Sequence, residues 1–184
     1  MTNVELVLLG FAVALPVAAA MEPWARVLHG QVWHRALWRI HRSHHSQRNG
    51  RFEANDALSA AHAPIAAALV MIGCNLHGPA AAITIGIGAG MTAFGLSYLV
   101  VHDGLVHGRL PVSFLARFAW LRRIRNAHRI HHARGEAPYG FFLGPRELKQ
   151  APRAPAEHPS APPTSAPALA EPPDTRSDGA HPSA

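Results

Sequence analysis

The chain has 184 residues, the length of a single domain; 48% of them are hydrophobic and only 15% are charged. Soluble domains carry about 25% charged residues, so this composition argues against an ordinary soluble globule and favours a lipid-embedded protein. The net charge is +6 with histidine neutral, and the 14 histidines are nearly as many as the 17 lysines and arginines together. The single cysteine, Cys74, excludes an intramolecular disulfide and a cysteine-based zinc site.

Three apolar stretches, at about 4–21, 57–76 and 80–101, are candidates for membrane-spanning helices. A span needs about 20 mostly apolar residues, so the third stretch is the clearest of the three. The alternative for the first stretch is a signal peptide, and for the second it is a buried soluble helix. Because no basic residue precedes the first stretch, it lacks the start of a signal peptide, and we expect a retained span there.

The positions of lysine and arginine predict the orientation in the membrane. None precedes Trp24, none lies in the link 77–79, six lie between residues 25 and 56, and the others all follow residue 101. Three spans therefore place all 17 cations on one side, which the positive-inside bias makes the cytoplasm. The basic charge thus marks a membrane face, and we expect no nucleic-acid partner.

After the third stretch, residues 112–127 mix apolar residues with arginines, which predicts an interfacial helix with its arginines at the lipid headgroups. A fourth short or re-entrant span is the alternative, although Arg117 and Arg122 argue against a full crossing. From about residue 151 the chain is rich in proline and alanine and has no aromatic residue. We therefore expect a membrane-embedded domain over 1–150 and a disordered tail over 151–184.

Ten of the 14 histidines form a pattern that occurs twice, an H-x4-H pair followed by H-x-x-H-H. The first copy is His29, His34, His41, His44 and His45, and the second is His102, His107, His128, His131 and His132. Residues i, i+3 and i+4 lie on one face of a helix. We therefore expect one helix over about 24–46 to present most of the first copy to one centre, which the second copy faces from other helices. His158 and His181 lie in the expected disordered tail and are excluded from the site, and His62 and His77 remain unassigned.

Imidazoles at this density repel one another when protonated unless a metal ion holds them. All-nitrogen ligation suits zinc, copper, iron and nickel, and structural zinc takes only four ligands. Eight to ten histidines therefore favour a dinuclear redox centre of iron that activates O2, while the ligand count leaves a zinc pair open. A haem cytochrome fits poorly because His62 is the only midspan histidine, and a metal transporter would need more polar residues in its spans.

These histidines and their surroundings resemble the bacterial beta-carotene hydroxylases of the fatty acid hydroxylase superfamily, over about residues 4–150. The most specific match is the string His-Asp-Gly-Leu-Val-His at 102–107. One departure is that the family's His-Gly step falls on the second histidine of the first pair, and here it falls on His29. The other matching segments are His29-Gly30 with His34, Ser43-His44-His45, 52–56 (Phe-Glu-Ala-Asn-Asp), 90–95 (Gly-Met-Thr-Ala-Phe-Gly), 127–133 and 140–143.

The resemblance implies an all-α bundle of about three spans in the bacterial inner membrane, with a di-metal site on the cytoplasmic side. It implies a non-haem di-iron monooxygenase that uses O2 and electrons from reduced ferredoxin. The substrate would be a carotenoid from the bilayer, hydroxylated on its beta-ionone rings from beta-carotene through beta-cryptoxanthin to zeaxanthin. A related fatty-acid or sterol hydroxylase or desaturase is the alternative, because these enzymes share the histidine pattern.

The resemblance also implies that all ten histidines are metal ligands. We expect Asp103, between two of them, to accept an imidazole N–H and fix its tautomer; a helix cap or an ion pair with an arginine is the alternative. We expect Asp56 to cap the second span, and Glu53 either to do the same or to act at the site. The arginine-rich face either steers an acidic ferredoxin or anchors the protein to lipid.

Overall fold

The computed structural model describes residues 1–46, 50 and 52–150. The predicted disordered tail, with His158 and His181, lies outside these residues. Within them the chain is helical and forms no strand. Three segments are long and apolar enough to cross a membrane, Asn3–Ala36, Ala54–Cys74 and Gly78–Val106, and no fourth occurs among the described residues. The prediction of an all-α protein with three spans is confirmed.

The first span begins with α1 (Asn3–Val27), which starts at a capping box formed by Thr2 and Glu5. It continues into the wider π-helical turns of η1 (Leu28–Ala36). A turn at Leu37 then leads to α2 (Trp38–His41) and the 3₁₀ turn η2 (Arg42–His44). The prediction of one regular helix over 24–46 is therefore wrong, because the π turns and the kink at Leu37 change the direction of the chain.

The second span consists of α3 (Ala54–Ala60) and α4 (Ala63–Cys74), which are separated at residues 61 and 62. Pro64, which cannot donate a helical hydrogen bond, lies in the first turn of α4. A reciprocal capping box of Glu53 and Asp56 begins α3, as the sequence predicted for Asp56.

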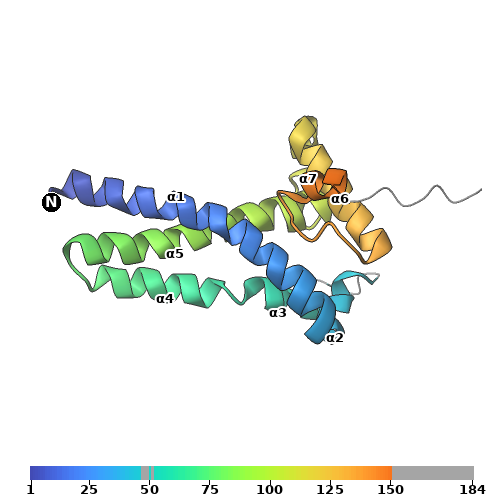
Figure 1. Ribbon diagram of the computed structural model, residues 1–184, viewed down its shortest axis with the longest axis horizontal. Coiled ribbons are helices and arrows are strands. Elements are labelled where there is room, and N and C mark those ends of the chain that lie inside the picture. The colour runs from blue at the N-terminus through green and yellow to red at the C-terminus, as the bar shows by residue number, and fades with distance from the viewer. Residues whose placement is uncertain (47–49, 51, 151–184) are drawn as a thin grey trace, which may run out of the picture. The chain divides into compact units, whose positions relative to one another are not determined.

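The third span is α5 (Gly78–Tyr98), which continues into the π-helical η3 (Leu99–Val106). It lies between α1 and α4 (Figure 1). A Cβ added to Gly90 would lie 2.5 Å from the carbonyl oxygen of Ala14 in α1, and one added to Gly88 would lie 2.8 Å from that of Ala66 in α4. Glycine therefore lets both neighbouring helices approach α5 closely.

The bundle ends in η4 (Ser113–Arg117), α6 (Ala119–Arg134) and α7 (Gly144–Gln150). The helix predicted over 112–127 is therefore a short 3₁₀ turn followed by a longer α-helix, because Phe118 between them is extended (φ −80°, ψ 120°). A small core of Val101, Leu105, Ile124 and Phe141 joins η3, α6 and the segment before α7.

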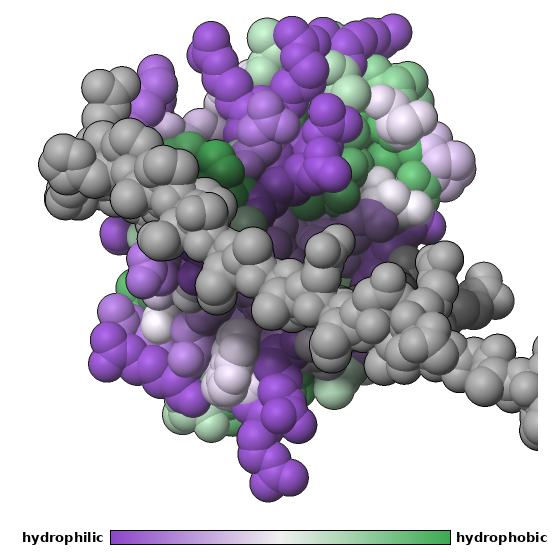
Figure 2. Space-filling model, turned by 90° about the vertical axis from the view of Figure 1, so that its right-hand side faces the viewer, coloured by the Kyte–Doolittle hydropathy of each residue, from purple (hydrophilic) through white to green (hydrophobic). Residues whose placement is uncertain are grey.

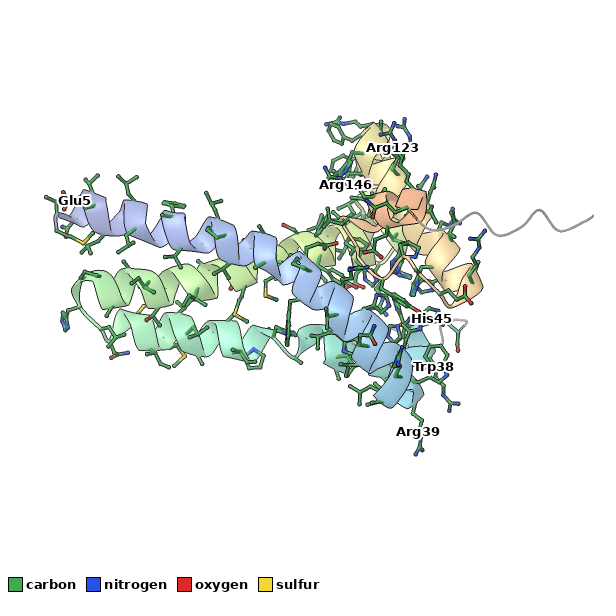
Figure 3. All side chains as sticks on the ribbon, in the orientation of Figure 1. Glu5, Trp38, Arg39, His45, Arg123 and Arg146 are labelled. Carbon is green, nitrogen blue, oxygen red and sulfur yellow. The ribbon has the colours of Figure 1, made fainter. Side chains whose placement is uncertain are left out.

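Charge is distributed unevenly between the two ends of the described bundle. Arg39, Arg123 and Arg146 lie at the end that carries α2, α6 and α7, whereas Glu5 lies at the opposite end (Figure 3). Figure 2 looks onto the arginine-bearing end and shows hydrophilic side chains that project from it at the top and bottom of the view, with hydrophobic residues among them. In contrast, α1 exposes an apolar surface that includes Val7, Phe11 and Leu15, as expected of a helix in lipid.

Candidate metal centre

The structure brings all ten predicted histidines together, in two adjacent groups of five. The first histidine group is His29, His34, His41, His45 and His131. The second histidine group contains His44, His107, His128 and His132. His102 joins the second group, since its Nε2 atom lies 3.1 Å from that of His44 and 3.2 Å from that of His128.

Each copy of the sequence pattern gives four histidines to one group and one histidine to the other. His44 departs from the first copy to the second group, and His131 departs from the second copy to the first group. The prediction that most of the first copy faces one centre is confirmed, since four of its five histidines lie in the first group; only His44 lies in the other group. In α6 the reason that His131 departs is geometric: at about 100° per residue, residue i+4 lies roughly 40° to one side of residue i and residue i+3 roughly 60° to the other.

Five of the ten imidazoles are fixed by hydrogen bonds from Nδ1 to acceptors outside the centre. In the first group, Nδ1 of His29 donates to the Tyr139 carbonyl (2.9 Å), that of His41 to Asn55 Oδ1 (2.7 Å) and that of His131 to the Glu136 carbonyl (2.7 Å). In the second group, Nδ1 of His44 donates to Glu53 (3.2 Å) and that of His102 to Asp103 (3.1 Å). These oxygens only accept, so each Nδ1 carries the proton and each Nε2 presents a lone pair.

The Nε2 atoms converge at distances that fit metal ions. Nε2 of His29 lies 3.1 Å from that of His41, and Nε2 of His44 lies 3.1 Å from that of His102. In neutral rings these contacts join two lone pairs and contain no hydrogen bond. Histidine nitrogens bind metals such as zinc at about 2.1 Å, which places two ligands at right angles about 3.0 Å apart. Both groups therefore have the donor atoms and spacing of a metal site.

Burial keeps these imidazoles neutral near pH 7. Removal from water, together with neighbouring imidazoles, lowers the pKa of His131 to about 4 and those of His45 and His107 to about 3. The same two causes lower the pKa values of His44 and His128. A neutral ring binds a metal ion without first losing a proton, so the centre suits metal binding at neutral pH.

Asp103 lies beside His102 of the second histidine group, as the sequence predicted. It accepts the Nδ1–H of His102, and its Oδ1 is 3.6 Å from Nη1 of Arg109. The sequence offered a hydrogen bond to an imidazole and an ion pair with an arginine as alternatives for Asp103, and the structure contains both contacts. Glu53 also serves twice, because it caps α3 and accepts from His44.

Several residues at the centre were missed by sequence reasoning. Asn55, which accepts from His41, belongs to the 52–56 string that carried the family resemblance, and this string was the available signal for it. Arg109 lies two residues after His107 and binds Glu53 (3.0 Å) and Asp56 (2.6 Å). Glu147 accepts from the backbone N–H groups of Tyr139 and Gly140, and so holds the segment whose carbonyl fixes His29.

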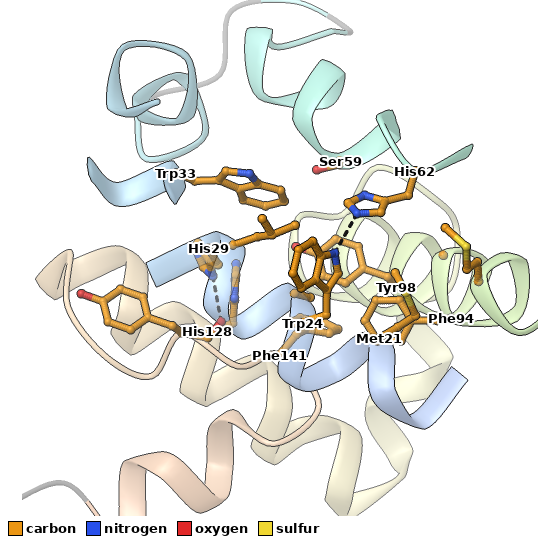
Figure 4. A pocket seen from close by; sticks show the side chains of 15 residues that line it. Met21, Trp24, His29, Trp33, Ser59, His62, Phe94, Tyr98, His128 and Phe141 are labelled. Atoms are coloured by element: carbon orange, nitrogen blue, oxygen red, sulfur yellow. Dashed lines mark hydrogen bonds between the residues drawn. The ribbon is translucent and has the colours of Figure 1, made fainter. Parts of the chain in front are cut away.

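A pocket between the spans leads to this centre (Figure 4). Its walls are mostly apolar and aromatic, and it reaches His29 of the first group and His128 of the second. Trp24 Nε1 donates to His62 Nε2 (3.0 Å) in the same pocket, which gives His62 a position that the sequence left unassigned. Other lining residues are Met21, Leu28, Met91, Phe94, Tyr98 and Phe141.

Comparisons with known proteins identify the family to which the chain is similar. The Fatty acid hydroxylase family model matches residues 14–145. Beta-carotene hydroxylase 1, chloroplastic, from Capsicum annuum is 44% identical over 142 residues, which are 76% of this chain and 45% of that protein. Beta-carotene 3-hydroxylase 1, chloroplastic, from Arabidopsis thaliana is 43% identical over 142 residues, 76% of this chain and 46% of that protein.

A bacterial relative covers more of its own length. Beta-carotene hydroxylase from Pantoea ananas is 40% identical over 129 residues, which are 68% of this chain and 71% of that protein. The chain spans about half the length of the plant relatives it matches, and no solved structure matches it. From the family model and the bacterial relative, the chain belongs to the fatty acid hydroxylase family.

Proposed function

We propose that this protein is a beta-carotene 3-hydroxylase of the bacterial inner membrane. The observation that carries the proposal is the apolar pocket that lies among the candidate spans and ends at one histidine of each group. A carotenoid dissolved in a bilayer needs such a route, because its ring must leave lipid and reach the metal centre without crossing water. Relatives from plants and a bacterium bear the name beta-carotene hydroxylase, which supports this substrate.

The reaction would insert oxygen into the C3–H and C3′–H bonds of the beta-ionone rings. At each carbon, one oxygen atom of O2 enters the C–H bond and the other leaves as water, which consumes two electrons and two protons. Two iron ions held by the ten histidines would supply the activation of O2. Successive hydroxylation of the two rings gives beta-cryptoxanthin and then zeaxanthin.

The protein's own residues would position the ring and exclude water. Tyr98 stacks on His102, with ring centres 4.4 Å apart, and lies beside Phe141. Phe141 is buried and lies edge-on to His102 and His128. These aromatic rings cover the second histidine group on the side of the pocket. An apolar ring can therefore approach the centre while bulk water is kept away.

The proposal includes an electron donor and an orientation. The arginine-bearing end of the bundle also carries His45 (Figure 3), so an acidic donor such as reduced ferredoxin would dock close to the centre. By the positive-inside bias this end faces the cytoplasm. Anchoring to anionic lipid headgroups is the alternative role for the same arginines.

Product analysis tests the proposed substrate. Expression in a host that accumulates beta-carotene should yield beta-cryptoxanthin and zeaxanthin, and the His131→Ala variant at equal abundance should yield neither. A metal-loaded protein that leaves beta-carotene unchanged would exclude the carotenoid as substrate. The appearance of hydroxylated or desaturated fatty acids or sterols in the same extracts would favour the related lipid-modifying enzymes.

A further inference from the structure

The two histidine groups differ in the groups that accept their outward N–H bonds. In the first group all three acceptors are neutral, namely the carbonyls of Tyr139 and Glu136 and the amide oxygen of Asn55. In the second group both acceptors are carboxylates, Glu53 and Asp103. Among the residues that the structure describes, no carboxylate accepts from an imidazole of the first group.

Arg109 holds both carboxylates of the second group. Its Nη2 atom lies 3.0 Å from Glu53 Oε1, while the other oxygen of Glu53 accepts from His44. Its Nη1 atom lies 3.6 Å from the Asp103 oxygen that accepts from His102. The Arg109 side chain is 13% exposed, so water screens these contacts little. One cation therefore fixes two carboxylates, and through them two imidazoles.

An imidazole that donates to a carboxylate is a more basic ligand than one that donates to a neutral carbonyl. His44 and His102 are therefore stronger donors than His29 and His41, although all four present Nε2 to the centre. We propose that the two metal positions are unequal: the second histidine group binds a divalent cation more tightly and fills first, and Arg109 is a positioning residue for it. The inference deepens the proposed function, because it concerns the same centre.

Metal titration tests the proposal without any substrate. The full-length protein in detergent is freed of metal with a chelator and titrated anaerobically with Co²⁺ alone, followed by calorimetry and by the visible absorption of the ion. Two steps should appear, with dissociation constants separated by about tenfold or more. The step that His132→Ala removes belongs to the second group, and the step that His45→Ala removes belongs to the first.

Two charge substitutions should move the steps in opposite directions. Asp103→Asn keeps a hydrogen-bond acceptor but removes the charge, so the second-group constant should weaken by about 10- to 100-fold. Asn55→Asp gives His41 a carboxylate acceptor, so the first-group constant should tighten and the two steps should approach one another. Arg109→Met should act like Asp103→Asn, and Arg109→Lys should restore part of the loss. Arg123→Gln, on the exposed face of α6, is the matched control and should change neither step.

Two equal steps in the unmodified protein would overturn the proposal, and so would an Asp103→Asn variant that weakens both steps alike. Circular dichroism and thermal melting of each metal-free variant separate a lost ligand from a lost fold. If Asp103→Asn does not fold, Asn55→Asp still decides between the two outcomes. A negative carotene assay with unequal titration steps would reject only the proposed substrate, whereas zeaxanthin formation with equal steps would reject only the inequality.

Discussion

The first and second histidine groups contain the same number of imidazoles but are built differently. The first group takes four members from the segment that follows α1, and backbone carbonyls and one amide orient it. The second group takes four members from η3, its C-terminal end and α6, and ion-paired carboxylates orient it. The difference teaches that the repeated histidine pattern specifies which imidazoles converge, while residues outside the pattern supply the acceptors that orient each group.

The largest effect is expected from removing one ligand of each group. His131→Ala and His44→Ala should each reduce activity by at least about 100-fold, because an open coordination position replaces a nitrogen donor. Metal analysis of the purified variants should show about one ion per chain fewer in each. His77→Ala, at the start of α5 and outside both groups, should leave activity and metal content unchanged. Retained turnover in either ligand variant would remove that histidine from the ligand set.

A change in the packing of α1 against α5 should affect both groups together. In Gly90→Val the new Cβ would lie 2.5 Å from the backbone oxygen of Ala14, which cannot rotate away. Overpacking of this kind costs about 3 kcal/mol, so the free energy of unfolding in detergent should fall by about that amount and both ions should be lost in parallel. Gly95→Ala meets nothing within 4 Å and serves as the control. Selective loss of one ion would show that the groups are supported independently.

Acid should destabilise the metal-free protein through both groups, over different ranges. Histidine titrates near pH 6.5 in the unfolded chain, whereas burial lowers the pKa of His131 to about 4 and that of His132 to about 2. The unfolded state therefore takes up more protons, and stability that is present above pH 6.5 is lost as the pH falls. Each such histidine contributes about 1.4 kcal/mol per pH unit.

Substitution separates the two acid ranges. His131→Gln should flatten the dependence of the unfolding free energy on pH between about 6.5 and 4, and the effect of His132→Gln should extend to lower pH. Unfolding in detergent at several pH values measures both slopes. His62→Gln, which replaces a histidine outside both groups, is the control and should leave the slopes unchanged. An unfolding free energy of the metal-free protein that increases as the pH is lowered from 6.5 to 5 would contradict the burial of neutral imidazoles.

The smallest effect is expected at the pocket, which touches both groups without holding metal. Trp24→Phe keeps an aromatic wall but removes the N–H that donates to His62. Loss of one such hydrogen bond is worth about 1 kcal/mol, so KM for the carotenoid should rise about fivefold while the metal content stays unchanged. Trp120→Phe, on the exposed part of α6, is the matched control. A change in metal content would instead assign Trp24 to the support of the centre.

The spans and the ligand set were predictable because both depend on local sequence. Hydropathy over about 20 residues marks a span, and the doubled histidine pattern named all ten imidazoles that converge. His29 illustrates the value of the pattern, since its His-Gly step departs from the family, yet its Nε2 lies 3.1 Å from that of His41.

The division into groups and the supporting residues were not predictable from local patterns. The path from α1 to η2 depends on π turns and on the kink at Leu37. A sequence prediction that places side chains at 100° per residue around a regular α-helix contains neither feature. Arg109 and Glu147 form ion pairs with residues that are distant in sequence. Arg109 pairs with Glu53, and Glu147 pairs with Arg26. Such ion pairs depend on how helices pack, so a lone arginine or glutamate in the sequence carries no signal for them.

The exchange of His44 and His131 between the two copies of the pattern has a consequence for biosynthesis. The first group needs His131 and the second needs His128 and His132, all on α6. Neither ligand set exists on the nascent chain until the third span has been synthesised and α6 has docked. Metal binding at the candidate centre would therefore have to follow the synthesis of α6, and a truncated chain that ends before α6 would lack one histidine of the first group and two of the second.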